Sequence, residues 1–77
     1  MNNIHLNKLP INCRGKVVKL NCDGNVRRRM LDLGIVKDTT IIPILKSPFG
    51  DPTAFEIRGS LVALRKEISE LIEVTFD

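Results

Sequence analysis

The chain has 77 residues, of which 43% are hydrophobic and 27% charged, with a formal net charge of +3. This length allows one modest core, and the apolar content argues against a disordered chain. No apolar run approaches the roughly 18 residues of a membrane helix, and the N-terminus lacks the apolar core of a signal peptide, so we expect one cytoplasmic domain over residues 1–77 that inserts into no membrane.

The N-terminal part predicts a loose turn followed by a strand. Leu6 and Leu9 point the same way within the first nine residues, and Pro10 ends that segment. Residues 14–20 (RGKVVKL) combine β-branched residues with lysines at exposed positions, and they predict a strand.

A helix is predicted next. Residues 21–25 (NCDGN) indicate a turn and a helix start, where an aspartate or asparagine side chain would cap the first amides. Val26, Met30 and Leu33 then fall at i, i+4 and i+7, which places them on one helix face. Gly34 suits the left-handed position just beyond a helix end. A helix of about ten residues is too short to be stable alone, so it must pack on a sheet.

The second half predicts short strands joined by turns. Residues 39–46 form one strand, in which Pro43 favours a sheet edge or a bulge because it lacks a donor. The turn-rich string SPFGDP follows, and Gly59-Ser60 is expected to be a tight hairpin turn. The remaining predicted segments are strands at 54–58, 61–65 and 72–76, with helical spacing over 66–72.

Short strands in so small a chain favour a barrel, because a flat open sheet would leave long exposed edges. The predicted fold is mainly β, a small barrel of five or six short strands with one short α-helix and a helical turn.

Three strings in this order resemble the FeoA family: RRRMLDLGI (27–35), SPFGDP (47–52) and RGSLVALRKE (58–67). The resemblance extends from about Leu6 to Val74 and implies an SH3-like β-barrel. The family often has Pro-Gly where this chain has Lys37-Asp38, and a β-branched residue at Pro43. Both departures suggest a locally different turn and strand edge.

The resemblance implies a transport partner. FeoA proteins are small cytoplasmic components of bacterial ferrous-iron transport, thought to act with FeoB, an Fe(II) permease with a cytoplasmic GTP-binding domain. It implies a non-enzymatic accessory or regulator of Fe²⁺ uptake, peripheral at the inner face of the membrane only through that partner. The same domain resembles the C-terminal module of some metal-dependent transcriptional repressors. A stand-alone counterpart of that module, or a small basic nucleic-acid-binding barrel, is the alternative.

The residue chemistry gives little material for catalysis or a cofactor. His5 is the only histidine, no phosphate-cradling glycine motif occurs, and no Cys-x-x-Cys spacing is present. Cys13 and Cys22 flank a predicted strand and would lie up to about 30 Å apart, so we expect free thiols. We therefore expect no enzyme, no cofactor and no dedicated metal site, although an adventitious ion at His5 or a cysteine stays open.

Charge is uneven along the chain. Residues 1–30 hold seven basic residues against one acid, whereas residues 31–77 hold five basic residues and eight acids. The basic half suits an acidic protein surface or nucleic acid, and it equally suits a solvated face. Three phenylalanines are too few for a base-stacking platform, so we expect no nucleic-acid partner.

Two segments carry the candidate partner surface. The three arginines of the helix fan over roughly 200° of its surface, and Arg28 can pair with Asp32. In the SPFGDP loop the prolines stiffen the backbone, Gly50 can take a positive φ and Asp51 can bond back to the turn. Phe49 either folds beneath the loop as a core cap or stays exposed as an apolar anchor.

The hypothetical partner-binding residues are Arg27, Arg28, Arg29, Asp32, Leu33, Pro48, Phe49, Gly50, Asp51, Pro52 and Arg58. Exposed strand edges and an apolar loop would also allow a weak homodimer.

Overall fold

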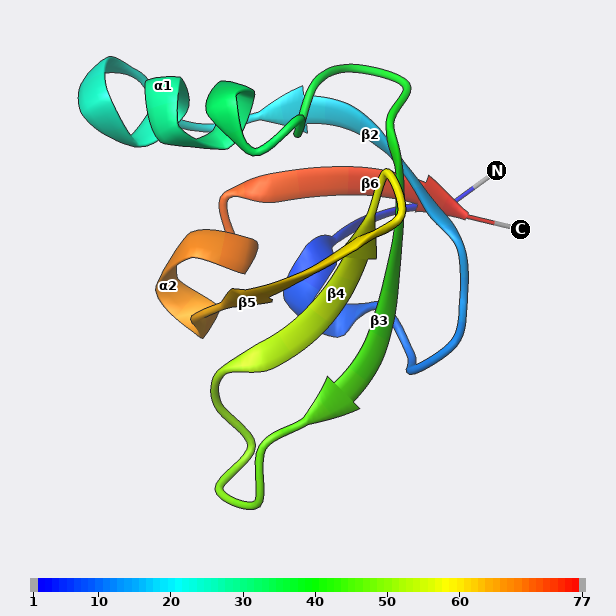
Figure 1. Cartoon of the computed structure of the whole chain (residues 1–77). Coiled ribbons are helices and arrows are strands. Elements are labelled where there is room, and N and C mark those ends of the chain that lie inside the picture. The colour runs from blue at the N-terminus through cyan, green and yellow to red at the C-terminus, as the bar shows by residue number, and fades with distance from the viewer. Residues whose placement is uncertain (1, 77) are drawn as a thin grey trace.

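The computed structural model describes residues 2–76, and Figure 1 shows a strongly curved sheet with its helices at the periphery. In chain order the elements are β1 (Asn2–His5), the 3-10 turn η1 (Leu6–Lys8), β2 (Gly15–Leu20), α1 (Gly24–Asp32), β3 (Thr40–Lys46), β4 (Thr53–Ile57), β5 (Ser60–Leu64), α2 (Lys66–Ser69) and β6 (Ile72–Phe76).

All strands belong to one antiparallel six-stranded sheet in the order β1-β6-β2-β3-β4-β5. The predicted mainly β fold, with short strands, one helix and a helical turn, is confirmed. The sheet is open, because its edge strands β1 and β5 do not pair with each other within residues 2–76.

The core lies inside the curve of the sheet. Its buried hydrophobic residues are Leu6, Leu9, Val17, Met30, Ile35, Ile41, Phe55, Ile57, Leu64, Ile72 and Val74. Gly15 is buried against this core, where an added Cβ would lie 2.8 Å from Leu9 Cδ2 and 2.9 Å from Val74 Cγ2. β2 can cross the core at this position only because no side chain is present.

The loose turn predicted for the first nine residues is wrong at its start. Asn2–His5 form strand β1, which pairs with β6 from Asn2↔Phe76 to His5↔Glu73. The segment NNIH shows no clear alternation of apolar and polar residues, so its strand conformation comes from the partner strand. The predicted inward direction of Leu6 and Leu9 is confirmed, since both are buried.

Pro43 lies at a bulge, as predicted, but not at a sheet edge. β3 is flanked by β2 and β4, and the β3–β4 register shifts between Pro43 and Leu45. The β2–β3 pairing is limited to Gly15↔Ile41 and Lys16↔Thr40, so it ends before Pro43. The Pro43 carbonyl instead accepts a 2.7 Å hydrogen bond from the Asn12 amide. The missing N–H therefore costs little here.

The β4–β5 turn lies one residue earlier than predicted. Ile57 pairs with Ser60, so the loop consists of Arg58 and Gly59 rather than Gly59-Ser60. Their φ angles are 53° and 85°, which fits a type I′ turn with positive φ at both central positions. Arg58 takes a conformation that glycine, asparagine or aspartate usually adopts. The sequence pattern therefore did not predict this turn position or the resulting register.

The turn before β3 shows how Lys37-Asp38 replaces Pro-Gly. Asp38 has φ of 73°, a left-handed conformation that aspartate tolerates better than most residues. Its amide donates to the Val17 carbonyl at 2.8 Å, and the Thr39 amide donates to the Val36 carbonyl at 3.0 Å. The departure from the family pattern is thus accommodated within a hydrogen-bonded turn.

Candidate functional site

The C-terminal end of α1 fixes the helix to the core. The Ile35 amide donates to the Met30 carbonyl at 2.9 Å, and the Gly34 amide donates to the Leu31 carbonyl at 3.0 Å. With Gly34 at φ of 87°, these bonds form a Schellman motif. Met30 and Ile35 are both buried, so the hydrophobic contact that accompanies this motif ties the helix end to the core.

The predicted apolar face of α1 is only partly buried. Met30 is 1% exposed, whereas Val26 is 37% and Leu33 is 41% exposed. A single methionine therefore anchors the face, and its two neighbours remain open to solvent.

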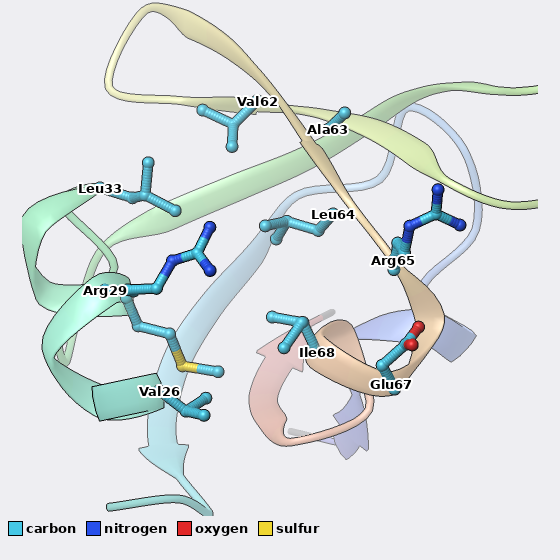
Figure 2. Close-up of a pocket in the computed structure, with 10 residues that line it drawn as sticks. Val26, Arg29, Leu33, Val62, Ala63, Leu64, Arg65, Glu67 and Ile68 are labelled. Carbon is cyan, nitrogen blue, oxygen red and sulfur yellow. The ribbon is translucent and has the colours of Figure 1, made fainter. Parts of the chain in front are cut away.

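These open side chains form one wall of a groove, shown in Figure 2. The opposite wall is β5 with the residue after it, and α2 closes one end. The groove has a volume of about 510 Å³. Its lining residues are Val26, Arg29, Met30, Leu33, Val62, Ala63, Leu64, Arg65, Glu67 and Ile68. Most of them are apolar, and two arginines and one glutamate supply the charge.

The three arginines of α1 are exposed, and two of them line different hollows of the surface. Arg29 lines the groove beside β5, whereas Arg27 lies with β2 residues such as Lys19 at another surface hollow. The predicted Arg28–Asp32 ion pair is not formed, because the one ion pair within 4.0 Å among residues 2–76 joins Arg65 to Asp51. A long exposed arginine gains little from an i+4 carboxylate in water, so solvation prevails.

The loop that contains Phe49 is closed by its own backbone. The Ser47 amide donates to the Pro52 carbonyl at 3.1 Å, and the Gly50 amide donates to the Ser47 carbonyl at 2.8 Å. Gly50 has φ of 86°, as the sequence predicted. Phe49 at the tip is 97% exposed. It is therefore not a core cap, and the loop holds its shape without using this ring.

The prediction that Asp51 bonds back to its own turn is wrong, because this side chain contacts α2 instead. Its Oδ1 accepts a 2.8 Å hydrogen bond from the Lys66 amide, and its Oδ2 lies 3.6 Å from Arg65 Nη1. Lys66 is the first residue of α2, whose leading amides lack partners inside the helix. Asp51 thus fastens the Phe49 loop to α2, at the end of the groove.

The eleven predicted partner residues form two separate groups. Figure 1 places α1 at one end of the molecule and the loop between β3 and β4 at the other. Arg58 belongs with the α1 group, since a Cβ added at Gly34 would lie only 2.9 Å from Arg58 Cδ. The groove beside α1 could not be predicted from the sequence, because only the fold places β5 opposite α1.

The described part of the chain contains no cluster of side chains that could hold a metal ion. No three His, Cys, Asp or Glu residues there lie close enough to bind one ion. Cys13 and Cys22 are free thiols, as predicted, and Cys22 Sγ lies 3.5 Å from Met30 Sδ. His5 Nδ1 lies 2.7 Å from the Glu70 carbonyl oxygen, a contact that ties β1 to the segment before β6.

No helix within residues 2–76 is both long and apolar enough to cross a membrane.

The curved six-stranded sheet belongs to the SH3-like class of small β domains. A crystal structure of Stenotrophomonas maltophilia FeoA in complex with zinc, described as a prokaryotic SH3 domain protein, superposes with a TM-score of 0.78; it is 26% identical, and the match covers 91% of this chain and 87% of that chain.

The chain belongs to the FeoA family, because the FeoA domain model matches residues 4–75. A FeoA-like protein from Clostridium acetobutylicum, solved by NMR, is 37% identical with a TM-score of 0.89, covering 99% of this chain and 88% of that one. A manganese-dependent transcriptional repressor shares the fold at 19% identity and a TM-score of 0.88, and the match covers all of this chain and 38% of the repressor. No curated protein matches the sequence.

Proposed function

We propose that this protein is a non-enzymatic accessory component of ferrous iron uptake, which binds the cytoplasmic part of a FeoB-type Fe(II) permease. The observation that carries this proposal is the FeoA domain match over residues 4–75, nearly the whole chain. For the S. maltophilia relative, a role as a ferrous iron transport activating factor has been suggested. The protein would then work in the cytoplasm and reach the membrane only through its partner.

The Phe49 loop supports a docking role. Phe49 is 97% exposed at the tip of a loop closed by two backbone hydrogen bonds. An aromatic side chain on a preorganised backbone loses little conformational entropy on binding, and such residues are frequent interface hot spots. Leu45, which is 66% exposed at the end of β3, adds apolar surface in the strand that leads into this loop. The loop gains nothing in folding from an exposed phenylalanine, so contact with a partner is its best explanation.

The arginines of α1 support an acidic partner surface. Arg27, Arg28 and Arg29 are exposed, and none of them lies within 4.0 Å of a carboxylate within residues 2–76. Such charges speed association with an acidic surface, and their contribution falls as salt is added. Because these arginines and Phe49 lie at different ends of the molecule, we expect them to contact separate parts of the permease.

Titration of the isotope-labelled protein with the soluble GTP-binding part of the cognate permease tests this proposal. NMR shift changes are expected in residues 47–52 and in α1. Phe49→Ala should weaken binding by about tenfold or more, and Ile11→Ala is the control, since Ile11 is also exposed, at 38%, but lies outside the loop and outside α1. A Phe49→Ala protein that binds as tightly as the parent would remove the loop from the interface. No binding by the parent to this part or to the whole permease would overturn the proposed function.

A further inference from the structure

β5 is an edge strand, and the geometry of the turn before it determines which of its backbone N–H and C=O groups are unpaired. Because Arg58 and Gly59 form a two-residue type I′ turn, Ile57 and Ser60 are a hydrogen-bonded pair. Hydrogen-bonded and non-bonded pairs alternate along an antiparallel ladder, so the backbone groups of Val62 also face β4. The N–H and C=O groups of Leu61 and Ala63 therefore point away from the sheet.

This free edge lacks the usual protection. The backbone hydrogen bonds outside the ladders of residues 2–76 include none from Leu61 or Ala63. The β5 sequence SLVAL contains no proline and no charge, and Leu61 is 69% exposed. Natural sheets normally block such edges with lysine, proline, a bulge or a covering segment. An open, apolar edge of this kind is a template for another strand.

The groove beside α1 runs along this edge. Its β5 wall is made of consecutive residues, Val62, Ala63 and Leu64, followed by Arg65. Neighbouring side chains of a strand point to opposite faces, so a space that touches all of them borders the edge and not one face. In Figure 2 the side chains of Val62 and Leu64 point toward the apolar side chains of α1, with Ile68 of α2 at one end. Unpaired backbone and an apolar groove thus meet in one place.

We infer that the β5 edge and the groove together bind an extended segment of a partner protein. The segment would pair with the backbone of Leu61 and Ala63 as a seventh strand beyond the observed six-stranded sheet. Every second side chain would enter the groove between β5 and α1, where Val26 and Leu33 are already more than a third exposed. A volume of about 510 Å³ is enough for a few apolar side chains.

The charges around the groove select an acidic segment. Arg29 and Arg65 line it together with one acid, Glu67, and Arg58 lies in the turn at the other end of β5. Arg65 also lies 3.6 Å from Asp51, so Arg29 is the groove-lining arginine that has no carboxylate within 4.0 Å among residues 2–76. A segment with apolar residues at alternate positions and acidic residues at its ends matches this pattern.

A second copy of this chain fits the same site poorly. β5 itself brings no acid, and it lies between Arg58 and Arg65. An antiparallel β5–β5 pair would therefore place basic residues of the two copies opposite one another, which is unfavourable. The inferred occupant is therefore a different protein. The site shares Arg29 of α1 with the proposed permease surface but not the Phe49 loop, so the inference stands whether or not the permease binds.

The test uses a synthetic peptide of alternating valine and threonine, with capped termini and two glutamates at each end. Titration of the full-length labelled protein should give saturable binding, with shifts in β5, α1 and α2. The amides of Leu61 and Ala63 should become protected from hydrogen exchange, because they donate to the peptide. A peptide with a proline at its centre, or with lysines in place of the glutamates, should bind at least about tenfold more weakly.

Ala63→Pro gives the matched variant. Proline is tolerated on an edge strand where its N–H would face solvent, so the β4 pairing should survive while the outward donor is lost. This variant should bind the peptide about tenfold more weakly, and Ala63→Ser, which keeps the donor, should bind like the parent. Arg29→Glu, on the opposite wall, should also weaken binding of the acidic peptide.

Three results would overturn the inference. The first is the absence of saturable binding. The second is peptide binding that leaves the Leu61 and Ala63 amides unprotected or tolerates the central proline. The third is a concentration-dependent dimer of the protein alone with those same amides protected, which would make a second copy the occupant. None of these results bears on the permease titration, so the two proposals fail separately.

Discussion

The α1 end and the Phe49 loop both present apolar side chains to solvent, but they are held in different ways. Around α1, partly exposed Val26 and Leu33 flank Met30, which is 1% exposed and joins the core. In the loop, Phe49 is 97% exposed and contributes no burial, while backbone bonds and Asp51 hold the loop itself. At α1, neighbouring side chains of one helix face both stabilise the fold and form exposed surface, whereas in the loop different groups serve these two roles. Substitutions in the two regions should therefore change the free energy of unfolding by different amounts.

Of the substitutions that test this contrast, Met30→Ala should cause the largest loss in the free energy of unfolding. Removing a buried methionine side chain costs about 2–5 kcal/mol, a large part of the stability of so small a domain. Chemical denaturation followed by circular dichroism measures the loss. Leu33→Ala, on the same helix face but 41% exposed, is the matched control and should cost much less. Equal losses at the two positions would show that Met30 is not the anchor of α1.

Gly34→Ala should cause the second largest loss in the free energy of unfolding. An alanine at φ of 87° is strained by about 1 kcal/mol, and its Cβ would lie 2.9 Å from Arg58 Cδ. Gly24→Ala is the control, because Gly24 also has a positive φ, of 62°, but nothing within 4 Å of an added Cβ. The free energy of unfolding should therefore fall further for Gly34→Ala. Combining it with Arg58→Ala should remove the excess, and an unchanged excess would place its origin elsewhere.

Asp51→Ala should have a moderate effect that is confined to the loop and α2. It removes the acceptor for the Lys66 amide and the carboxylate near Arg65, which together are worth about 1 kcal/mol. Amide exchange at Lys66 should accelerate. Asp51→Asn keeps an acceptor at Oδ1 and should stay close to the parent. An Asp51→Ala protein with unchanged exchange at Lys66 would show that the loop is held without this residue.

Phe49→Ala should have the smallest effect on stability. A side chain that is 97% exposed loses almost no burial on truncation, so the free energy of unfolding should change by less than about 0.5 kcal/mol. The same denaturation experiment measures it. A loss above about 1 kcal/mol would mean that the ring packs on the protein in solution, and the contrast with α1 would disappear.

Much of the fold was predictable because local rules and tertiary packing agree. Helix α1 (Gly24–Asp32) ends just before Gly34, as the apolar spacing and the glycine predict, and the positive φ of Gly50 follows from the turn chemistry. The errors lie where tertiary contacts outweigh local preference. β1 is a strand only because β6 supplies its hydrogen bonds, and Arg58 occupies a left-handed position because the Ile57↔Ser60 pair requires it.

The candidate site shows the same division. The sequence predicted the arginines of α1 and the Phe49 loop as candidate partner residues, because a run of charges and an aromatic residue within a turn can be recognised from consecutive residues. It did not reveal that Asp51 reaches α2, or that β5 is an edge strand beside an apolar groove. Both depend on which strands become neighbours.

By itself the sequence determined the family, the helix end at Gly34 and the positive φ of Gly50, since each depends on the chemistry of a few consecutive residues. Only the tertiary structure decided which side chains are exposed. Phe49 and Phe55 are alike as residues, yet one is 97% and the other 1% exposed. Burial depends on which segments the sheet brings together, and residues far apart in the chain decide that.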